Sequence, residues 1–550
     1  MNERRWKSRQ WFSQRLSRRA FLAKTGMSAT ALATLALAGC RREGPAQAPE
    51  AGPAAPRRGG VIKRAFTADA EHLDPVLETT WTMLIAPYIY SKLLRWNAEV
   101  TEIVPDLALS MPEVPDRLTF VFKLRPGTQW WDGSPLTSED VAFTFMRIAD
   151  PKVNSPHRYK VGPLERAETP DDRTVVFRLQ RPFAPFVSYA ATGWLMVLPK
   201  RWVESKGDRF QEALGSGPFR IADRRRAVFT RFERNSLYYV PDRPYPDAVD
   251  LRIIPDFATL DSALITGEID YIASLTDKGR IDAILAANPR LKVIQGPALH
   301  WNFFIMNCEK PPFRDKRVRQ AINLLVDREL YLQVVHPTGG KPSGPVTWGF
   351  EKYAIPQEEL ARLPGYRKPK DQDIREARLL LAAAGYESGL SVHNITTSRP
   401  EHATYHDGSL ALRDQLARYG IELRLDISDQ ATLQAKRRAG AFESHVYVNG
   451  GSQEIDEYLY GPHYTGQARN VNRYSNPELD ALLDRQREIY DEQERKQLIM
   501  EIQRRLLDEV PSVWLADPVY YTITSPRLHN YKPYRAWDLS SDLYDAWVEG

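Results

Sequence analysis

The first forty residues decide which part of this chain is left to fold. Arg18 and Arg19 are closely followed by an apolar Phe-Leu pair, a weakly apolar stretch occupies 27–36, and Leu37–Cys40 reads Leu-Ala-Gly-Cys. A basic region, a short apolar core and small residues before a cut are typical of an export signal, and paired arginines indicate the twin-arginine route. We therefore expect residues 1–39 to be a twin-arginine signal peptide, so that folding begins beyond them.

The cysteine that ends this segment predicts how the protein is held at the membrane. Leu-Ala-Gly-Cys resembles a lipobox, in which the cysteine, here Cys40, is diacylated and becomes the mature N-terminus. The alternative is a transmembrane helix, but the apolar run is shorter than the roughly 20 residues that a span needs. We expect a periplasmic protein that contacts the membrane only through a lipid on Cys40. Residues 40–60, with four prolines and no large apolar residue, are expected to form a disordered tether.

Charge and cysteine content narrow the classes of function. The chain has 75 Lys/Arg and 70 Asp/Glu, of which residues 1–39 hold eight and one, so the remainder is nearly neutral. That balance argues against a nucleic-acid partner. If Cys40 is lipidated, Cys308 has no disulfide partner, and we expect it to be a buried small hydrophobic residue rather than a nucleophile. The 511 residues after the signal are enough for two or three packed units.

Helices and strands are mixed along the folded part. Alternation of apolar and polar residues predicts strands at 118–124 and 421–425. The segment 371–385 predicts a helix that ends at a glycine, and 477–507 predicts one or two amphipathic helices. Helices that alternate with strands are typical of an α/β fold.

Several blocks of sequence occur together in a fixed order. One pair reads Phe-Lys-Leu-Arg-Pro-Gly at 122–127 and Trp-Asp-Gly-Ser-Pro-Leu-Thr-Ser-Glu-Asp-Val at 131–141. Gly-Ser-Gly-Pro-Phe follows at 215–219, then Pro-Phe-Arg-Asp at 312–315 and Val-Arg-Gln-Ala-Ile at 318–322. Together these blocks resemble the family 5 extracellular solute-binding proteins of ABC transporters, the peptide and nickel binders. Because the blocks also have physical roles as turns and packing segments, we assign none of them a role in binding.

The resemblance implies an α/β architecture, the two-lobed type II periplasmic-binding-protein fold with a hinge and an extra small domain on lobe I. The implied parts are 61–96 as the first part of lobe I, 97–210 as the extra domain, 211–300 as the second part of lobe I, 301–510 as lobe II, and 511–550 as a C-terminal return to lobe I. It also implies a monomer without a cofactor that captures a peptide or peptide-like solute between its lobes. Closure of the hinge around the ligand would then deliver it to the permease subunits of an ABC importer.

The resemblance places the ligand at loops where strands cross between the lobes. The candidate ligand-binding residues are Thr80, Trp81, Trp194, Trp301, Asn302, Tyr447, Asn449, Gly450 and Gly451. Trp and Tyr offer a wide apolar face with a polar edge, which suits permissive recognition. The alternative for each aromatic residue is packing in the core.

One departure from the family pattern bears on the ligand. Oligopeptide binders of this family place an aspartate just after this strand of lobe II, where it holds the α-ammonium of the peptide. Here the sequence continues from Asn449 as Gly-Gly-Ser-Gln, and the next acids are Glu454 and Asp456. A free amine is therefore in doubt, and a blocked peptide, a sugar, an opine or another solute remains an alternative.

Three other possibilities for the function remain to be weighed. His402 and His406 are four residues apart on an expected helix and could bind a metal such as nickel, although a solvated helix N-terminus explains them as well. An exported hydrolase is a further class, but the sequence has no G-x-S-x-G and no H-E-x-x-H, so we expect no enzyme. A sensor that presents its ligand to a receptor would share the same fold.

Overall fold

The computed structural model describes the folded part of the chain in several stretches. The described residues are 55–77, 81–97, 101–297, 299–399, 402–533, 543 and 545–549. Residue contacts separate the segment up to Ala55 from a second unit, Pro56–Gly550, which contains every described helix and strand. The predicted signal peptide, Cys40 and most of the predicted tether lie outside the described residues. Among those described, no helix combines the length and apolar character needed to cross a membrane.

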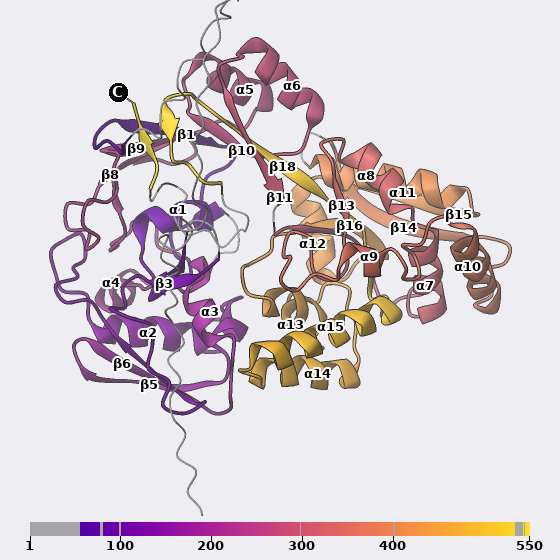
Figure 1. Cartoon of the computed structure of the whole chain (residues 1–550), viewed down its shortest axis with the longest axis horizontal. Helices are drawn as coiled ribbons and strands as arrows, with labels where there is room; N and C mark the ends of the chain where they lie inside the picture. The colour runs from indigo at the N-terminus through magenta and orange to yellow at the C-terminus, as the bar shows by residue number, and fades with distance from the viewer. Residues whose placement is uncertain are drawn as a thin grey trace, which may run out of the picture. The chain divides into compact units, whose positions relative to one another are not determined.

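Two four-stranded sheets form the first part of the fold. In one, β1 (Val61–Phe66) pairs parallel with β9 (Ala248–Ile253), and β8 (Phe229–Arg234) and β7 (Phe219–Arg225) follow antiparallel. In the other, β18 (Ala516–Thr524) lies between β10 (Tyr271–Leu275) and β11 (Lys292–Pro297) and also pairs with β13 (Gly340–Pro342). Helices α5 (Phe257–Thr266) and α6 (Lys278–Ala287) pack on the second sheet. We call these two sheets with their helices lobe I (Figure 1).

A small domain inserted in the first half of the chain has its own sheet. Strand β6 (Thr174–Leu179) lies between β4 (Thr119–Lys123) and β5 (Leu164–Asp171), and helix α2 (Ser138–Ala149) packs against β5 and β6. The strand predicted at 118–124 is confirmed by β4. Close aromatic pairs fill the core between sheet and helix, namely Phe120–Phe186, Phe122–Phe177 and Phe145–Phe177. We call this part the small domain.

Lobe II is built on a five-stranded sheet in the order β15-β14-β16-β12-β17. Its strands are β15 (Ile421–Ser428), β14 (Leu390–Thr397), β16 (Ser444–Asn449), β12 (Trp301–Met306) and β17 (Ser512–Trp514). The first three are parallel, and β12 runs antiparallel to both of its neighbours. Every residue of β12 is buried, as expected for a strand covered on both faces.

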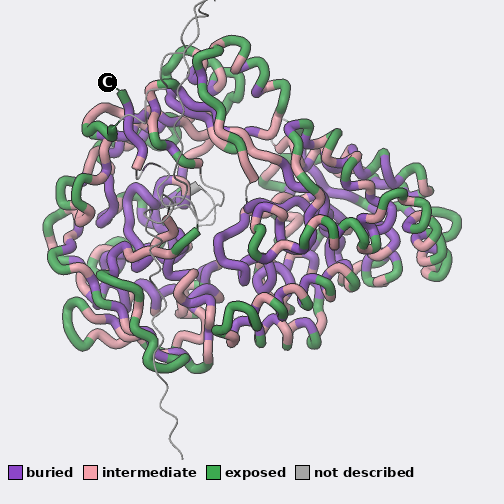
Figure 2. Tube along the Cα trace, viewed as in Figure 1, coloured by how far each residue is buried: buried purple, intermediate pink, exposed green. Residues whose placement is uncertain are grey.

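Helices cover both faces of the lobe II sheet. Phe304 and Met306 of β12 face a core shared with α7 (Lys316–Leu325), α10 (Asp371–Ala383) and α11 (Ala403–Ala417). Trp301, Phe303 and Ile305 face a second core shared with α12 (Gln430–Ala439), α13 (Asp456–His463), α14 (Pro477–Glu488) and α15 (Glu492–Glu509). Figure 2 shows buried residues gathered along the inner strands and exposed residues on the outer turns of the helices. The two helices in 477–509 confirm the sequence-based expectation for that segment.

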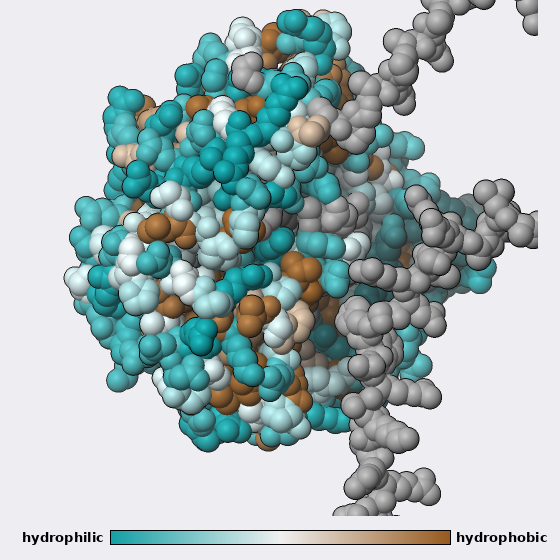
Figure 3. Space-filling model, turned by 60° about the vertical axis from the view of Figure 1, so that its left-hand side comes forward, coloured by the Kyte–Doolittle hydropathy of each residue, from teal (hydrophilic) through white to brown (hydrophobic). Residues whose placement is uncertain are grey.

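The remaining elements are short. They are α1 (Trp81–Ile89), β2 (Leu94–Trp96), β3 (Ile103–Pro105), η1 (Arg158–Val161), α3 (Phe186–Ala190), η2 (Gly193–Leu195), α4 (Lys200–Lys206), α8 (Arg328–Val335), α9 (Gln357–Leu360), β19 (Leu528–His529) and β20 (Trp547–Val548). On the face of the molecule in Figure 3, hydrophobic residues lie in small groups among hydrophilic ones.

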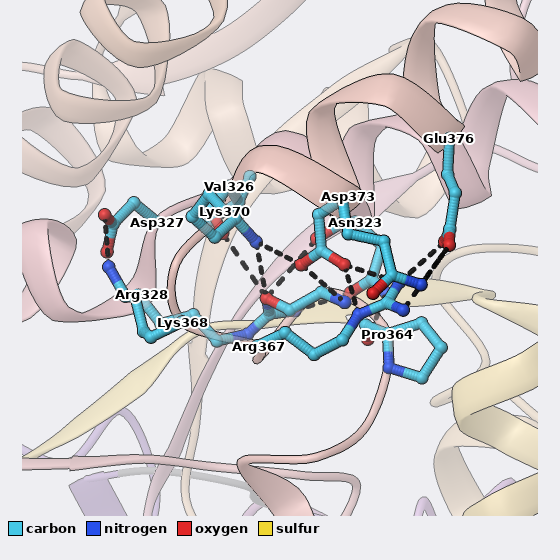
Figure 4. Close-up of polar contacts among 12 residues, drawn as sticks. Asn323, Val326, Asp327, Arg328, Pro364, Arg367, Lys368, Lys370, Asp373 and Glu376 are labelled. Atoms are coloured by element: carbon cyan, nitrogen blue, oxygen red, sulfur yellow. Dashed lines mark hydrogen bonds and ion pairs between the residues drawn. The ribbon is translucent and has the colours of Figure 1, made fainter.

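A buried polar cluster fixes one long loop to lobe II (Figure 4). Arg328 donates a 2.6 Å hydrogen bond to the carbonyl oxygen of Gly365, and its guanidinium is almost fully buried. Asp373, also buried, accepts hydrogen bonds from Arg367 at 2.6 Å and from Lys370 at 2.8 Å. Burial lowers the pKa of Lys370 to about 8, although the carboxylate beside it favours the charged form. These contacts give the loop before α10 a single arrangement.

Two strand connections join lobe I to lobe II. The chain leaves β11 at Pro297 and begins β12 at Trp301, and it leaves β17 at Trp514 and begins β18 at Ala516. Because β11 and β18 pair with each other in lobe I while β12 and β17 pair in lobe II, the two connections run side by side. Two adjacent short connections between separate cores are the arrangement of a hinge.

Candidate ligand-binding site

A cavity of about 100 Å³ lies in lobe II directly beside the two connections. Its lining includes Trp301, the first residue of β12, and Trp514, the last residue of β17. The full lining is Trp301, Phe303, Arg437, Tyr447, Asn449, Pro462, His463, Ala468, Arg469, Val471, Asn472, Ser512 and Trp514. The structure therefore brings together three of the residues predicted from the sequence, Trp301, Tyr447 and Asn449.

Strand register explains why these three residues meet. In the antiparallel pair of β12 and β16, Trp301 lies opposite Asn449 and Phe303 lies opposite Tyr447. Residues opposite each other, and residues two apart on one strand, share a face of the sheet. The same alternation directs Phe304 into the other core of lobe II. The cavity is thus a gap on one face of the sheet, with aromatic side chains from adjacent strands as its wall.

Several polar atoms of the cavity residues are buried and have no hydrogen bond. The Nε and Nη1 atoms of Arg437, both ring nitrogens of His463 and Oδ1 of Asn472 have no hydrogen-bond partner among the described residues. The Arg437 guanidinium lies 4.3 Å from the centre of the Tyr447 ring. Burial lowers the pKa of His463 to about 3, so this imidazole is neutral at pH 7.

Lobe II also contacts the small domain through buried charges. Lys160 Nζ lies 2.5 Å from Glu457 Oε2, and the two side chains are 2% and 3% exposed. The Tyr159 hydroxyl donates to the same Glu457 oxygen at 2.6 Å. Next to this pair, the hydroxyl of Tyr189 donates to Asp456 at 3.0 Å. We call these five side chains the interdomain cluster. Arg469, which lines the cavity, connects the cluster to it. Arg469 also pairs with Glu457.

Other predicted residues have different positions. Trp194 is buried in the small domain, where its ring stacks on His157 at 4.4 Å. Asn302 donates to the buried carboxylate of Asp517 at the connections, from its backbone nitrogen at 2.7 Å and from Nδ2 at 3.1 Å. Neither residue lines the cavity. Their contact with a ligand stays a prediction.

The remaining predicted residues lie in a tight turn after β16 and around residues 78–80, which are outside the described residues. At Gly451 an added Cβ would overlap the carbonyl oxygen of Leu299 and the hydroxyl of Tyr458, so the turn after β16 requires a glycine. Gly450 precedes it and is half-buried. Thr80 lies outside the described residues, and Trp81 is described only as the first residue of α1.

The two histidines of the expected helix lie at the N-terminus of α11. His402 is the N-cap of α11, where its Nδ1 accepts a hydrogen bond from the backbone nitrogen of Tyr405, and its ring stacks on the Tyr405 ring. His406 instead contacts Asp407 at 3.0 Å. Across the described residues, no group of three His, Cys, Asp or Glu side chains is placed to hold a metal ion.

Cys308 packs at the edge of the second core of lobe II and is half-buried. Burial raises the pKa of its thiol to about 11. A thiol with a raised pKa is a poor nucleophile, as the sequence led us to expect.

Sequence reasoning missed the polar residues of the cavity. Arg437 belongs to a Lys-Arg-Arg run at the end of α12, where basic residues are favourable in any helix. His463 lies at the end of a helix that was not expected, and Arg469 follows it in a loop. Only the three-dimensional packing of α12 on the lobe II sheet places Arg437 over Tyr447, so no local signal identifies it.

Two α/β lobes joined by paired connections, with a cavity beside the connections, define a two-lobed solute-binding protein. Residues 102–470 match the model of the bacterial extracellular solute-binding proteins, family 5. Because the match covers more than half of the sequence, the chain belongs to this family. Its fold is the type II periplasmic-binding-protein fold, as expected from the sequence.

Individual proteins resemble the chain over most of its length. The glutathione-binding protein GsiB of Pectobacterium atrosepticum is 25% identical over 476 residues, which are 84% of this chain and 89% of that protein. The oligopeptide-binding protein AppA of Bacillus subtilis is 23% identical, over 82% of this chain and 84% of its own. Among solved structures, the PBP AgaA in complex with agropinic acid from A. tumefacien R10 is 25% identical with a TM-score of 0.76, and the match covers 89% of this chain and 99% of that one.

Proposed function

We propose that this protein captures a peptide or peptide-like solute between its lobes and delivers it to the permease of an ABC importer. The observation that carries the proposal is the cavity with aromatic walls in lobe II, which lies beside the paired connections and whose Arg469 donates to the Tyr159 hydroxyl of the small domain at 2.9 Å. Relatives named for glutathione and for oligopeptides support a peptide-like ligand. The agropinic acid bound by AgaA supports the alternative, a non-peptide solute such as an opine.

The proposed mechanism is closure of the hinge, in which the two lobes and the small domain move as rigid bodies. We propose lobe I as 61–96 and 211–300, the extra domain as 97–210, lobe II as 301–510, and 511–550 as the return to lobe I. The separate sheets support this division, the cores of lobe II are separate from that of the rest, and the pairing of β18 with β10 and β11 supports the return. A ligand that contacts both sides would shift the population toward the closed state. The protein would act as a monomer without a catalytic step.

The cellular location is proposed from the N-terminal sequence. The motif at Arg18 and Arg19 supports twin-arginine export, and Leu-Ala-Gly-Cys supports lipidation of Cys40 and anchoring in a membrane at the periplasm. Replacement of both arginines by lysine should leave the precursor in the cytoplasm. Cys40→Ala should give an exported protein that fractionates as soluble, and a variant that stays membrane-bound would contradict lipid anchoring.

Native mass spectrometry of the protein as purified tests the proposed ligand class. A ladder of small adducts lost on activation, with masses and fragments of short peptides, is the expected result. A single adduct with the mass of an opine, a sugar or a metal complex would contradict the peptide reading and favour the alternative. If the protein carries no adduct, calorimetric titration with a mixed di- and tripeptide library decides, and no heat of binding would contradict the proposal.

A further inference from the structure

Strand β18 changes its partner partway along its length. Its first three residues, Ala516–Pro518, lie opposite β13, whereas Val519–Thr524 lie opposite β11. Strand β13 follows α8 in the part of the chain proposed as lobe II, and β11 belongs to lobe I. One continuous strand therefore passes from one lobe to the other, and the passage lies inside the strand rather than before its first residue.

The carboxylate of Asp517, near the start of this strand, binds groups of lobe II. One oxygen accepts hydrogen bonds from the backbone nitrogen of Asn302 at 2.7 Å and from its Nδ2 at 3.1 Å. The other oxygen accepts from the Ser343 hydroxyl, and the Asp517 carbonyl oxygen accepts from Trp348 Nε1 at 3.0 Å. Asn302 lies in β12, and Ser343 and Trp348 follow β13. These donors therefore all come from lobe II.

The groups that bind Asp517 are themselves fixed in lobe II. The Tyr366 hydroxyl donates to the Ser343 carbonyl oxygen at 2.7 Å, and the Arg328 guanidinium lies 3.8 Å from the centre of the Tyr366 ring. Nε of the same arginine donates to the carbonyl oxygen of Trp514 at 2.7 Å. Through Arg328, the buried cluster of Figure 4 holds both β17 and the loop after β13.

Asp517 is buried without a cation. It is 1% exposed and forms no ion pair with any of the described residues. Lys341 lies opposite it in the register of β13 and β18, but the Lys341 Nζ atom lies over the Trp348 ring, 5.0 Å from its centre. A buried carboxylate without a cation is costly unless hydrogen bonds offset the cost. The donors of lobe II therefore stabilise the carboxylate and hold its strand in place.

The two partners of β18 meet at Val519, where the strand is less firmly held. The Val519 nitrogen donates to the Gly339 carbonyl oxygen at 2.8 Å, and Pro297 lies opposite Val519 on β11. Neither Pro297 nor Pro518 has a backbone N–H, so each removes a donor from the ladder at this point. A change of direction is therefore easier around Val519 than at Asp517.

We infer that Asp517 is a positioning residue of the hinge: its carboxylate fastens the start of β18 to lobe II, and the strand bends around Val519 when the lobes close. Ala516 and Asp517 then move with lobe II, although they lie within the segment 511–550 proposed as the return to lobe I. The inference rests on the proposed function, because a hinge acts only where the lobes close.

The anchor also keeps the wall of the cavity in one arrangement. Trp301 directly precedes Asn302, whose backbone nitrogen donates to Asp517. The nitrogen of Leu515, which directly follows Trp514, donates to the Asn302 carbonyl oxygen at 2.9 Å. Both tryptophans line the cavity. A bend beyond Asp517 therefore closes the lobes without moving these two walls relative to each other.

Hydrogen exchange of the ligand-free full chain, followed by mass spectrometry, tests the anchor. Asp517→Ala should make the amides of 341–348 and 515–517 exchange at least about ten-fold faster, since hydrogen bonds to a charged group are strong. The amides of 520–524, beyond the bend, should keep their wild-type rates. Equal acceleration along the whole of β18, or unchanged rates at 341–348, would overturn the inference.

Two further variants control this measurement. Asp517→Asn keeps an oxygen for Asn302, and its Nδ2 can donate to the Ser343 hydroxyl, so its exchange should stay close to that of the wild type. Ser343→Ala removes a single partner and serves if Asp517→Ala does not fold. It should accelerate the same segments to a smaller extent, and acceleration confined to 520–524 would contradict the anchor.

Two engineered disulfides locate the bend. Pro342 lies opposite Ala516 and Gln295 lies opposite Tyr521, and strand partners are about 4.5–5.5 Å apart, as a disulfide requires. With Pro342→Cys and Ala516→Cys oxidised, a mixed di- and tripeptide library should lower the radius of gyration as in the wild type, because both positions move with lobe II. Gln295→Cys with Tyr521→Cys is the control within lobe I. Loss of the change in the first oxidised pair, with recovery on reduction, would place the bend before Ala516 and overturn the inference.

The two measurements separate failure of the inference from failure of the proposed function. If the library neither binds the wild type nor changes its radius of gyration, the peptide function fails, and the exchange pattern, which needs no ligand, decides the inference. If the library closes the wild type but not the oxidised Pro342→Cys, Ala516→Cys protein, the proposed function stands and the inference is wrong.

Discussion

The buried ion pair between Lys160 and Glu457 should stabilise the contact of the small domain with lobe II rather than the fold of either part. The two charges belong to the small domain and to lobe II, which we propose move relative to each other; they lie 2.5 Å apart and are 2% and 3% exposed. In an open molecule both would be hydrated, so the pair exists only when the bodies meet. Replacement of Lys160 by methionine should therefore act on closure.

The free-energy cost of replacing Lys160 depends on the contacts that Glu457 retains. Loss of one member of a buried pair costs about 3–5 kcal/mol when the other charge is left alone. Here Glu457 still contacts Arg469 and the Tyr159 hydroxyl, so the cost is closer to that of one charged hydrogen bond, about 2 kcal/mol. That free energy lowers the ratio of closed to open molecules by roughly thirty-fold. Where the ligand binds only the closed form and the open form dominates without ligand, the apparent Kd rises by a similar factor.

Small-angle scattering of the ligand-free protein and calorimetric Kd values test this reasoning. Lys160→Met should increase the radius of gyration and weaken ligand binding. Lys123→Met is the matched control, because Lys123 pairs with Glu113 on the same small domain at 3.1 Å with both side chains more than half exposed. The reasoning is refuted if Lys160→Met lowers the Tm while the radius of gyration and the Kd stay at the wild-type values.

Three further predictions concern stability and reactivity. Gly451→Ala should lower the free energy of unfolding by about 1–3 kcal/mol or more, because its Cβ overlaps backbone, whereas Gly296→Ala, where a Cβ meets nothing within 4 Å, should be nearly neutral in urea titrations. Burial raises the pKa of Asp517 to about 6, above the value near 3.9 of an unfolded Asp, so stability should fall by about 3 kcal/mol as pH rises from about 3 to about 7, and Asp517→Asn should remove that fall. Since burial raises the pKa of Cys308 to about 11, its reaction with a disulfide reagent at pH 8 should be roughly a hundred-fold slower in the folded than in the urea-unfolded protein, and equal rates would contradict this.

The parts of the fold that the sequence could predict are those with local patterns. The strand at 119–123 and the helices in 477–509 follow from alternation and amphipathic spacing, and they form as expected. The helix predicted over 371–385 ends at Ala383, with Gly385 at a φ of +85° just beyond it. The expected helix with the two histidines is described from Ala403, with His402 as its cap.

In the candidate site, residues whose positions depend on a single strand were predictable from the sequence. Residues whose positions depend on several packed elements were not. Trp301, Tyr447 and Asn449 were expected from the resemblance to the family, and all three line the cavity. Trp194 and Asn302 carry the same kind of signal but contact their own surroundings. A single sequence cannot distinguish these outcomes, because both a cavity wall and a packed core favour large aromatic residues beside strand ends.

The polar residues show why the pairing of charged side chains could be identified only from the structure. Arg437, Lys160 and Arg495 are all basic residues on or near helices, and each would pass for a solvated charge in the sequence. In the structure Lys160 and Arg495 are neutralised by buried carboxylates, whereas two nitrogens of Arg437 are not hydrogen-bonded. Whether a basic side chain is neutralised depends on which carboxylate lies opposite it. For Lys160 that carboxylate is Glu457, which is about three hundred residues away in the sequence. The pairing of buried charges is therefore determined by contacts across the fold, and counting the acids and bases of a segment such as Glu454–Glu457 would not have identified it.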